Sequence, residues 1–262
     1  MNANSSSVLI TGASGGIGYE LAKLFAKDRH NLVLVARSNA KLAQVAEELQ
    51  RRFEISVKAV ALDLTDPEAP QNLFEGLKRD AVSVDILVNN AGYGKLGEFA
   101  AIPLEESLGQ IQLNIVALTS LTRLFLGPMV ERRAGKILNV ASTAGFQAGP
   151  LMAVYYATKA YVISFSEALA NELVDKGVSV TCLCPGATAT DFASRAGNDK
   201  SRLFKQLRPM DAKAVALTGY RGLIAGKTLV IAGLRNWLVA ESLRISPRSL
   251  VTAVSRKLNE AK

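Results

Sequence analysis

Two tyrosines stand side by side in the segment VYYATKA, residues 154–160, and a lysine follows them at position 159. On a helix, residues three and four apart share a face, so either Tyr155 or Tyr156 can reach Lys159. A free tyrosine has a pKa of about 10, which is too high for ready proton exchange near neutral pH. A nearby cation favours the phenolate and lowers that pKa, so that the phenol becomes usable as a general acid and base. The pattern therefore points to proton transfer by one of the two tyrosines.

A glycine cluster, TGASGGIG at 11–18, lies between an expected first strand and first helix. Glycines at this junction let the backbone turn tightly and approach a pyrophosphate, and the helix N-terminus offers free N–H groups to it. The spacing is G-x-x-x-G-x-G and differs from the general G-x-G-x-x-G fingerprint of dinucleotide-binding proteins. The alternative is a tight strand–helix turn that binds no ligand.

Residues at the ends of the second and third expected strands indicate which dinucleotide the protein would bind. Ala36 stands where an acidic residue would hold the ribose 2′-hydroxyl of NAD, and Arg37 follows it. A guanidinium suits a 2′-phosphate, and Ser14 could donate to it as well, so we expect NADP(H) rather than NAD(H). Arg37 could instead be a surface residue that leads into the next helix. Asp63 could accept a hydrogen bond from the adenine amine or cap a helix.

The elements that must position these groups alternate between strand and helix. Apolar runs predict strands at 7–12, 31–37, 57–63, 84–92, 135–142, 178–186 and 227–233. Helical spacing is found at 16–28, 39–53, 67–80, 107–129, 154–177 and 211–226. This alternation is typical of a parallel sheet covered on both faces. We therefore expect an α/β fold, a three-layer Rossmann-like doubly wound sheet of about seven strands, with Ser142 at the carboxyl end of the fifth strand, where such sheets bind ligands.

Composition limits the other possibilities. The start of the chain lacks a signal-peptide pattern, and no uncharged apolar stretch reaches about 18 residues, so we expect a cytoplasmic protein without a membrane-spanning helix. The single histidine, His30, allows no Ser–His–Asp triad, and no metal site is expected. Cys182 and Cys184 alternate along one strand and are expected to be small core residues.

The net charge of +8 is unevenly distributed, because residues 191–262 contain 14 Lys and Arg against 5 Asp and Glu. Such an excess suggests an anionic partner, which could be phosphate groups, an acidic carrier protein or an anionic lipid surface, or it is a solvated face. No nucleic-acid partner is expected.

Taken in order, these motifs resemble the short-chain dehydrogenase/reductase family over roughly residues 7–192. The matching segments are TGASGGIG at 11–18, NNAG at 89–92, Asn114, Ser142, YYATK at 155–159 and PGATATDF at 185–192. The resemblance assigns the family's Tyr-x-x-x-Lys to Tyr155 and Lys159. Tyr156 is then expected to face away, in packing or in a subunit contact.

The resemblance also implies a role for each matching residue. Tyr155 would be the general acid for reduction and the base for oxidation, and Ser142 would hydrogen-bond the substrate oxygen. Lys159 would bind the nicotinamide ribose, and Asn114 would hold a water that feeds protons through Lys159. The expected catalytic residues are Asn114, Ser142, Tyr155 and Lys159. The expected cofactor-binding residues are Gly12, Ser14, Gly15, Gly16, Ile17, Gly18, Arg37, Asp63, Leu64, Asn90, Ala91, Gly92, Tyr155, Lys159, Pro185, Gly186, Thr188 and Thr190.

The last quarter of the chain is expected to shape the substrate site. We treat residues 1–262 as a single domain in which residues 188–226 form a substrate lid, apolar inside and basic outside. Residues 233–262 predict two amphipathic helices split at Pro247. This helical C-terminal extension could pack on the core or lid, make a subunit contact, or dock on an anionic membrane as a peripheral contact. The resemblance suggests a homodimer or homotetramer through the helices near 107–128 and 154–176.

The expected function is that of an NADP(H)-dependent carbonyl reductase. Such an enzyme interconverts a ketone or 3-oxoacyl carbonyl and a secondary alcohol by hydride transfer. The apolar lid predicts a hydrophobic carbonyl substrate, free or linked to an acyl carrier or coenzyme A. Two alternatives are a non-catalytic NADP(H) sensor and a membrane-docked lipid-binding protein. A sensor has no need of Ser142, Tyr155 and Lys159 together, which argues against the first of these.

Overall fold

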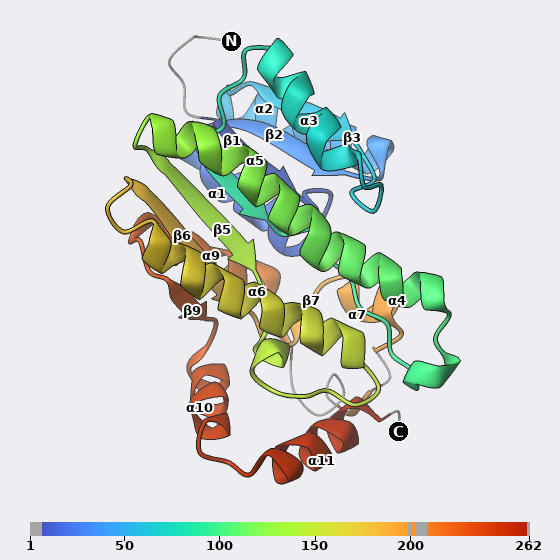
Figure 1. Cartoon of the computed structure of the whole chain (residues 1–262). Helices are drawn as coiled ribbons and strands as arrows, with labels where there is room; N and C mark the ends of the chain where they lie inside the picture. The colour runs from blue at the N-terminus through green and yellow to red at the C-terminus, as the bar shows by residue number, and fades with distance from the viewer. Residues whose placement is uncertain (1–6, 199–200, 203–208, 261–262) are drawn as a thin grey trace.

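The computed structural model describes residues 7–198, 201–202 and 209–260. Its centre is a seven-stranded sheet in the order β3-β2-β1-β4-β5-β6-β9, in which every pair of neighbouring strands is parallel (Figure 1). The strands are β1 Ser7–Thr11, β2 Asn31–Ala36, β3 Val57–Ala61, β4 Ile86–Asn89, β5 Gly135–Val140, β6 Val178–Cys184 and β9 Leu229–Ile231. The predicted doubly wound α/β fold is confirmed. The strand order reverses between β1 and β4, and a ligand cleft is expected outside the carboxyl ends of these strands.

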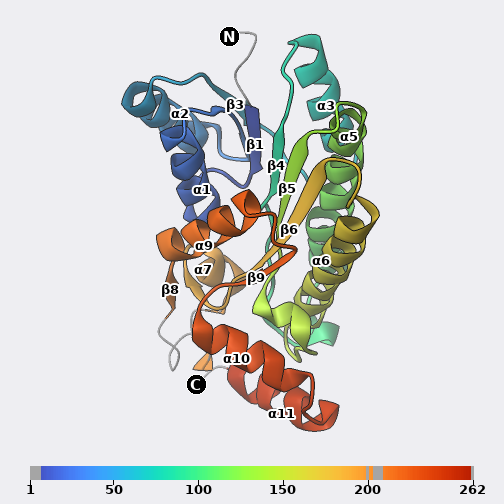
Figure 2. The same cartoon turned by 90° about the vertical axis from the view of Figure 1, so that its left-hand side faces the viewer.

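Two layers of helices cover the sheet, as Figure 2 shows with the sheet seen between them. One layer holds α1 Gly16–Lys27, α2 Asn39–Phe53 and α9 Ala212–Ile224, and the other holds α3 Ala69–Arg79, α5 Leu118–Glu131 and α6 Ala153–Glu172. Because side chains alternate along a strand, Val8 and Ile10 of β1 pack with the first layer and Leu9 packs with the second. Each fully buried aliphatic side chain of this kind contributes roughly 1.5–3 kcal/mol. Burial on both faces explains the near-continuous apolar strands.

The helix expected at 107–129 is longer and is interrupted. It consists of α4 Leu104–Ile111, a π-helical turn at Gln112–Ala117 and α5. The whole stretch, Leu104–Glu131, has 28 residues and a mean hydropathy of 1.5 over its most apolar window, so that length and composition alone would let it cross a membrane. Its side chains Leu121, Phe125 and Met129 are instead buried against the sheet. We therefore regard it as a core helix.

The predicted lid, residues 188–226, is shorter in the structure. Its first part forms a short strand pair, β7 Thr188–Ala189 with β8 Met210–Asp211, and the helix α7 Phe192–Ala196. From residue 212 the chain belongs to α9, whose Val215, Ala216 and Leu223 are buried against the sheet, so this part is core and not lid. Part of the lid composition used in the prediction falls outside the described residues, namely Lys200, Leu203, Phe204, Lys205, Leu207 and Arg208.

The C-terminal extension forms the two predicted helices, α10 Leu234–Leu243 and α11 Arg248–Asn259. Pro247 lies directly before α11, where its fixed φ suits a helix start. Figures 1 and 2 both show this α10–α11 hairpin beyond the carboxyl end of the sheet, away from the N-terminus. The hairpin thus lies at the edge of the sheet where ligands are expected.

Candidate active site

A cavity of about 1470 Å³ opens at the carboxyl ends of the strands. Pockets for single drug-sized ligands occupy roughly 300–1000 Å³, so this one has room for a dinucleotide and a second molecule. Of the residues expected at the site, all but Gly18 and Asn114 line the cavity. Both exceptions are buried directly behind its wall.

The glycine turn is held closed by side chains from β1 and from the end of β4. The Asn90 amide donates to the carbonyl oxygens of Thr11 (2.9 Å) and Gly12 (3.2 Å). The Thr11 hydroxyl accepts from the backbone N–H groups of Asn90 and Ala91. Gly12 has φ +67°, and a Cβ on Gly18 would lie only 2.4 Å from the Gly12 carbonyl oxygen. This turn therefore requires glycine at both positions, and it leaves the N-terminus of α1 facing the cavity.

Arg37 and Asp63, which the sequence analysis assigns separately to the adenosine part of a cofactor, lie at one end of the cavity. Arg37 and Asp63 are both exposed on its wall, beside Ser38, which follows β2. Asp63 accepts from the backbone N–H (3.0 Å) and hydroxyl (2.8 Å) of Thr65, an arrangement local to its own turn and distant from the start of α3. Burial opposes ionisation of Asp63, but the two bonds from Thr65 and the Arg37 charge outweigh it and lower its pKa. Arg37 thus remains free to meet an anion in the cavity.

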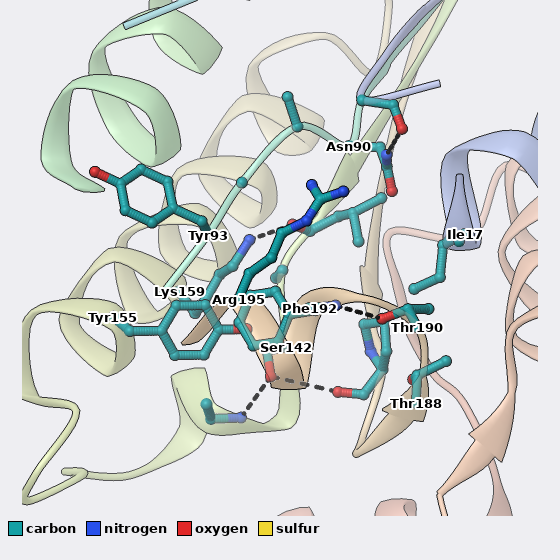
Figure 3. A pocket seen from close by; sticks show the side chains of 18 of the residues that line it. Ile17, Asn90, Tyr93, Ser142, Tyr155, Lys159, Thr188, Thr190, Phe192 and Arg195 are labelled. Carbon is teal, nitrogen blue, oxygen red and sulfur yellow. Dashed lines mark hydrogen bonds between the residues drawn. The ribbon is translucent and has the colours of Figure 1, made fainter. Parts of the chain in front are cut away.

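Tyr155, Ser142 and Lys159 gather at the other end of the cavity (Figure 3). Tyr155 and Lys159 are one turn apart on α6 and buried. The Tyr155 hydroxyl lies close enough to the Ser142 side chain for Ser142 to lower its pKa, and the Ser142 hydroxyl donates to the Pro185 carbonyl oxygen at 3.4 Å. The Lys159 ammonium donates to the Val140 carbonyl oxygen at 2.8 Å and lies 5.8 Å from the centre of the Tyr155 ring. Ser142 is held in turn by the N–H of Ala144 at 3.1 Å. The three groups that the sequence singled out therefore form one cluster.

The pKa directions differ from the sequence-based expectation for Tyr155. Burial raises its pKa above the ordinary value of about 10, and the neighbouring Ser142 offsets this only in part. Burial also lowers the pKa of Lys159, to about 8. The expected lowering of the Tyr155 pKa is not seen because desolvation by burial is the largest contribution to the shift. At neutral pH, Tyr155 carries its proton and is placed to donate it.

Asn114 lies in the π-helical turn between α4 and α5. Turns of this kind are frequently found at functional sites. Its amide donates to the Tyr93 carbonyl (2.9 Å) and the Thr158 hydroxyl (3.0 Å), and it accepts from the Tyr93 N–H (3.1 Å). Both ends of the side chain therefore tie the segment after β4 to α6. Asn114 and the Lys159 ammonium face the same space, since a Cβ on Gly92 would lie 3.0 and 3.4 Å from them. The water-holding role predicted for Asn114 stays a prediction.

The segment that follows β6 forms another wall of the cavity. Pro185, Gly186, Thr188 and Thr190 all line it, and the Thr190 hydroxyl accepts from the N–H of Phe192 at 3.3 Å. A Cβ on Gly16 would lie 3.0 Å from the Thr190 methyl group, so this segment touches the glycine turn. The Phe192 ring lies 5.2 Å from the Tyr155 ring, centre to centre. The segment thus bridges the two ends of the site.

Sequence reasoning missed several residues of the site. Thr11 and Thr158 act through hydrogen bonds to the backbone, and a lone threonine gives no signal for such a role. Arg195 of α7 lines the cavity beside the cluster, as Figure 3 shows, whereas the sequence analysis expects basic residues on the outside of this segment. Tyr156 also lines the cavity, and its hydroxyl donates to Asn259 of α11 at 3.2 Å. The expectation that Tyr156 faces away from the site is therefore wrong, because it lines the cavity and contacts the C-terminal extension.

The other candidates add no further chemistry. Cys182 and Cys184 are buried free thiols with Sγ atoms 3.9 Å apart. Within the described part of the chain, no group of three or more His, Cys, Asp and Glu side chains could hold a metal ion.

The residues present fit a dinucleotide with a 2′-phosphate. Among the described residues, no side chain caps the first turn of α1, so its N–H groups are available to a pyrophosphate at the glycine turn. Arg37 offers a guanidinium at the adenosine end, and Lys159 offers an ammonium at the opposite end. The Arg37 guanidinium matches the charge of a 2′-phosphate, and the Lys159 ammonium can donate to ribose hydroxyls.

Comparison with protein families gives one decisive match, since residues 6–201 fit the family model described as short chain dehydrogenase. This chain belongs to the short-chain dehydrogenase/reductase family. Members of this family are oxidoreductases, and we therefore assign this chain to the oxidoreductases.

Among curated members of the family, the very-long-chain 3-oxoacyl-CoA reductase of Bos taurus is 36% identical over 191 residues, 71% of this chain and 60% of its own length. The chain thus spans less than two thirds of that relative. The NADP-dependent 3-hydroxy acid dehydrogenase of Schizosaccharomyces pombe is 31% identical over 235 residues, 86% of this chain and 89% of its own. Among solved structures, a short-chain dehydrogenase from Sphingobium yanoikuyae in complex with NADPH is 34% identical, with a TM-score of 0.82 over 92% of this chain and 93% of that one. The Sphingobium structure therefore shares the fold of this chain.

Proposed function

We propose that this chain is an NADP(H)-dependent carbonyl reductase that interconverts a hydrophobic ketone or 3-oxoacyl carbonyl and a secondary alcohol. The observation that carries the proposal is the buried cluster of Tyr155, Ser142 and Lys159 at the end of a cavity that also contains Arg37 and the glycine turn. A proton donor and a dinucleotide cradle in one cavity suit hydride transfer to a carbonyl.

In this proposal, the chain's own residues handle the charge and the proton. When bound, the reduced nicotinamide supplies the hydride to the carbonyl carbon. Tyr155 gives its phenolic proton to the carbonyl oxygen, which completes the alcohol, and later regains a proton from solvent. Ser142 donates a hydrogen bond to the same oxygen as charge develops on it. Lys159 stabilises the resulting phenolate and binds the ribose, and Asn114 holds α6 in place.

Two similarities support the cofactor and the substrate class. The Sphingobium enzyme was solved with NADPH and the Schizosaccharomyces enzyme is named as NADP-dependent, in agreement with Arg37 and the missing acid at Ala36. The Bos taurus relative is named for a 3-oxoacyl-CoA, which supports a carbonyl on a hydrocarbon chain linked to coenzyme A or an acyl carrier.

A panel of carbonyl compounds tests the proposal directly. Purified protein is mixed with NADPH or NADH and with ketones, a 3-oxoacyl thioester and aldehydes, and cofactor oxidation is followed by absorbance. We expect NADPH-dependent reduction of at least one hydrophobic carbonyl. If NADPH binds and no member of the panel is reduced, the NADP(H)-sensor function is favoured instead.

We also propose a peripheral membrane contact for the outer face of the α10–α11 hairpin. Leu234, Leu238 and Ile245 are 73%, 55% and 89% exposed there, and the exposed Arg244 and Arg248 flank Ile245. Apolar side chains among arginines suit an anionic lipid surface. Sedimentation with vesicles of anionic and neutral phospholipid tests this, with Ile245→Asp expected to abolish pelleting with the anionic ones. The predicted cytoplasmic location and the absence of a nucleic-acid partner stay predictions.

Oligomerisation is a further part of the proposal. Leu104, Leu108, Ile111 and Val116 leave an exposed apolar stripe along α4 and the π-helical turn. Exposed apolar stripes of this kind mark subunit interfaces. We propose that this stripe joins two copies of the chain in a homodimer, or four in a homotetramer with a second contact.

A further inference from the structure

The cavity continues past Tyr155 to the α10–α11 hairpin. Its far wall is formed by Val239, Ala240 and Leu243 of α10 and by Val254 and Leu258 of α11, with the polar Arg235 and Asn236 at the start of α10. The apolar positions are four residues apart or adjacent on their helices, so each helix turns an apolar face toward the cavity. Met152, which precedes α6, lines the same cavity from the body of the protein.

Helix α11 buries polar side chains and exposes apolar ones, which is the opposite of the pattern in a helix that packs on a hydrophobic core. Its buried residues are polar, Ser255 and Asn259, whereas Val254 is 50% exposed and lines the cavity. Val239 of α10 is also 50% exposed although it lines the cavity. A helix that served only to cover the core would bury its apolar side chains. The apolar face is therefore open to a ligand.

Polar contacts fasten the hairpin at its two ends. At the end of α11, Asn259 accepts from the Tyr156 hydroxyl at 3.2 Å and donates to the Pro150 carbonyl oxygen at 2.9 Å. Tyr156 itself is fixed by close packing, since a Cβ on Gly149 would lie 2.2 Å from its ring. At the start of α10, Asn236 donates to the Ala232 carbonyl oxygen at 2.7 Å. The ends are anchored, and the apolar middle spans the cavity.

We propose that the α10–α11 hairpin forms an apolar subsite for the hydrocarbon part of the substrate and that the Tyr156–Asn259 contact holds this subsite closed. The assignment rests on the proposed function, because it places the reacting carbonyl at Tyr155. The ligand is a hydrocarbon group remote from the carbonyl. Val254 and Leu258 meet it, and Tyr156 and Asn259 position the helix that carries them.

The test compares two phenylalanine variants on the same helix. Val254→Phe narrows the subsite, and Leu250→Phe, one turn earlier at an exposed position outside the cavity lining, is the matched control. The substrates are methyl ketones from 2-butanone to 2-dodecanone, with 2-decalone added to tell a ring from a chain. For the unchanged protein we expect kcat/KM to rise with chain length, by up to about fourfold for each methylene group that becomes buried. For Val254→Phe we expect a fall of at least about tenfold with 2-dodecanone, carried by KM, and less than twofold with 2-butanone.

A binding measurement separates this inference from the proposed function. Dodecanoate binding to the same proteins is measured by calorimetry, which needs no turnover. Weaker binding in Val254→Phe than in Leu250→Phe supports the subsite even if no ketone is reduced. Equal binding in the two variants, or a ketone series that is independent of chain length, overturns it.

The contact that closes the subsite is tested by Tyr156→Phe, Asn259→Ala and their combination. Each single change should raise the KM for 2-dodecanone by about tenfold, while kcat with 2-butanone stays within about twofold. Because both changes break the same contact, the double variant should be no worse than the more affected single one. Additive effects, or equal effects on both ketones, would contradict this role.

Discussion

The rings of Tyr155 and Tyr156 lie edge to face with centres 6.1 Å apart, and their hydroxyl groups meet different parts of the chain. The Tyr155 hydroxyl meets Ser142 after β5, and the Tyr156 hydroxyl meets Asn259 of the last helix. In the proposed function, the two adjacent phenols serve two purposes, one in proton transfer and one in holding the C-terminal hairpin. This division is the basis of the predictions that follow.

Tyr155→Phe removes the proposed proton donor without removing the ring that packs against Phe192. We expect kcat for ketone reduction to fall by about 10²- to 10⁴-fold while NADPH binding is unchanged. Tyr161→Phe is the control, because Tyr161 is on the same helix and its hydroxyl meets Thr119. Steady-state kinetics and NADPH fluorescence titration are the measurements. Equal rates for Tyr155→Phe and the unchanged protein would remove Tyr155 from the mechanism.

Arg37→Asp should change the preferred cofactor. The carboxylate loses the guanidinium contact to a 2′-phosphate and repels that group, so the Kd for NADPH should rise by about 10- to 100-fold. The new acid should at the same time improve NADH binding. Arg51→Asp, a change of equal charge on the outer part of α2, should leave both affinities unchanged. An unchanged ratio of the NADPH and NADH affinities in Arg37→Asp would rule out this role.

Lys159 should make stability depend on pH in a defined window. Its pKa is lowered to about 8 by burial, whereas an unfolded lysine titrates near 10.4, so between these values the unfolded chain binds more protons. Stability then rises with pH in this window. Relative to Lys159→Met, the free energy of unfolding should increase by about 2 kcal/mol between pH 7.5 and 9.5. Urea unfolding of both proteins at several pH values measures this, and a constant difference would contradict the lowered pKa.

Asn114→Leu should destabilise the protein, because it leaves the Tyr93 backbone groups and the Thr158 hydroxyl without their buried partner. We expect a loss of at least about 2 kcal/mol in the free energy of unfolding. Asn171→Leu, which changes an exposed amide on α6, should cost less than about 0.5 kcal/mol. Urea unfolding followed by circular dichroism compares the two. Similar losses in both variants would mean that the Asn114 contacts contribute little.

Leu108→Asp should disrupt the proposed subunit contact along α4. The side chain is 53% exposed, so the substitution can be tolerated in a monomer but not at an apolar interface. Leu238→Asp, at a similarly exposed position on α10, is the control for surface charge. Light scattering coupled to size-exclusion chromatography should show a smaller species for Leu108→Asp alone. The same mass for all three proteins would place the interface elsewhere.

The sheet and the main site residues could be predicted because their signals are local or stand in a fixed order. Strands buried on both faces read as apolar runs, and the glycine turn, Ser142 and the Tyr155–Lys159 spacing each lie within or next to a single element. The π-helical turn at Gln112–Ala117 was missed because one extra residue in a turn hardly alters the apolar pattern of a long helix.

Contacts between distant segments could not be predicted. Tyr156 and Asn259 are 103 residues apart, and their bond depends on how the hairpin folds back across the cavity. The pKa direction of Tyr155 was also missed, since the depth of burial follows only from packing. For the same reason, the sequence could not show that α9, which falls within the predicted lid region, packs against the sheet.

The last strand, β9, ends at Ile231, three residues before the hairpin begins at Leu234. All strands of the seven-stranded sheet therefore precede the α10–α11 hairpin, which we propose contacts the hydrocarbon part of the substrate. A different segment could therefore follow Ile231 without altering the pairing of the sheet. Protein engineers could graft a different tail after Ile231 to redirect the enzyme toward new ketones, provided that the graft supplies its own partner for Tyr156.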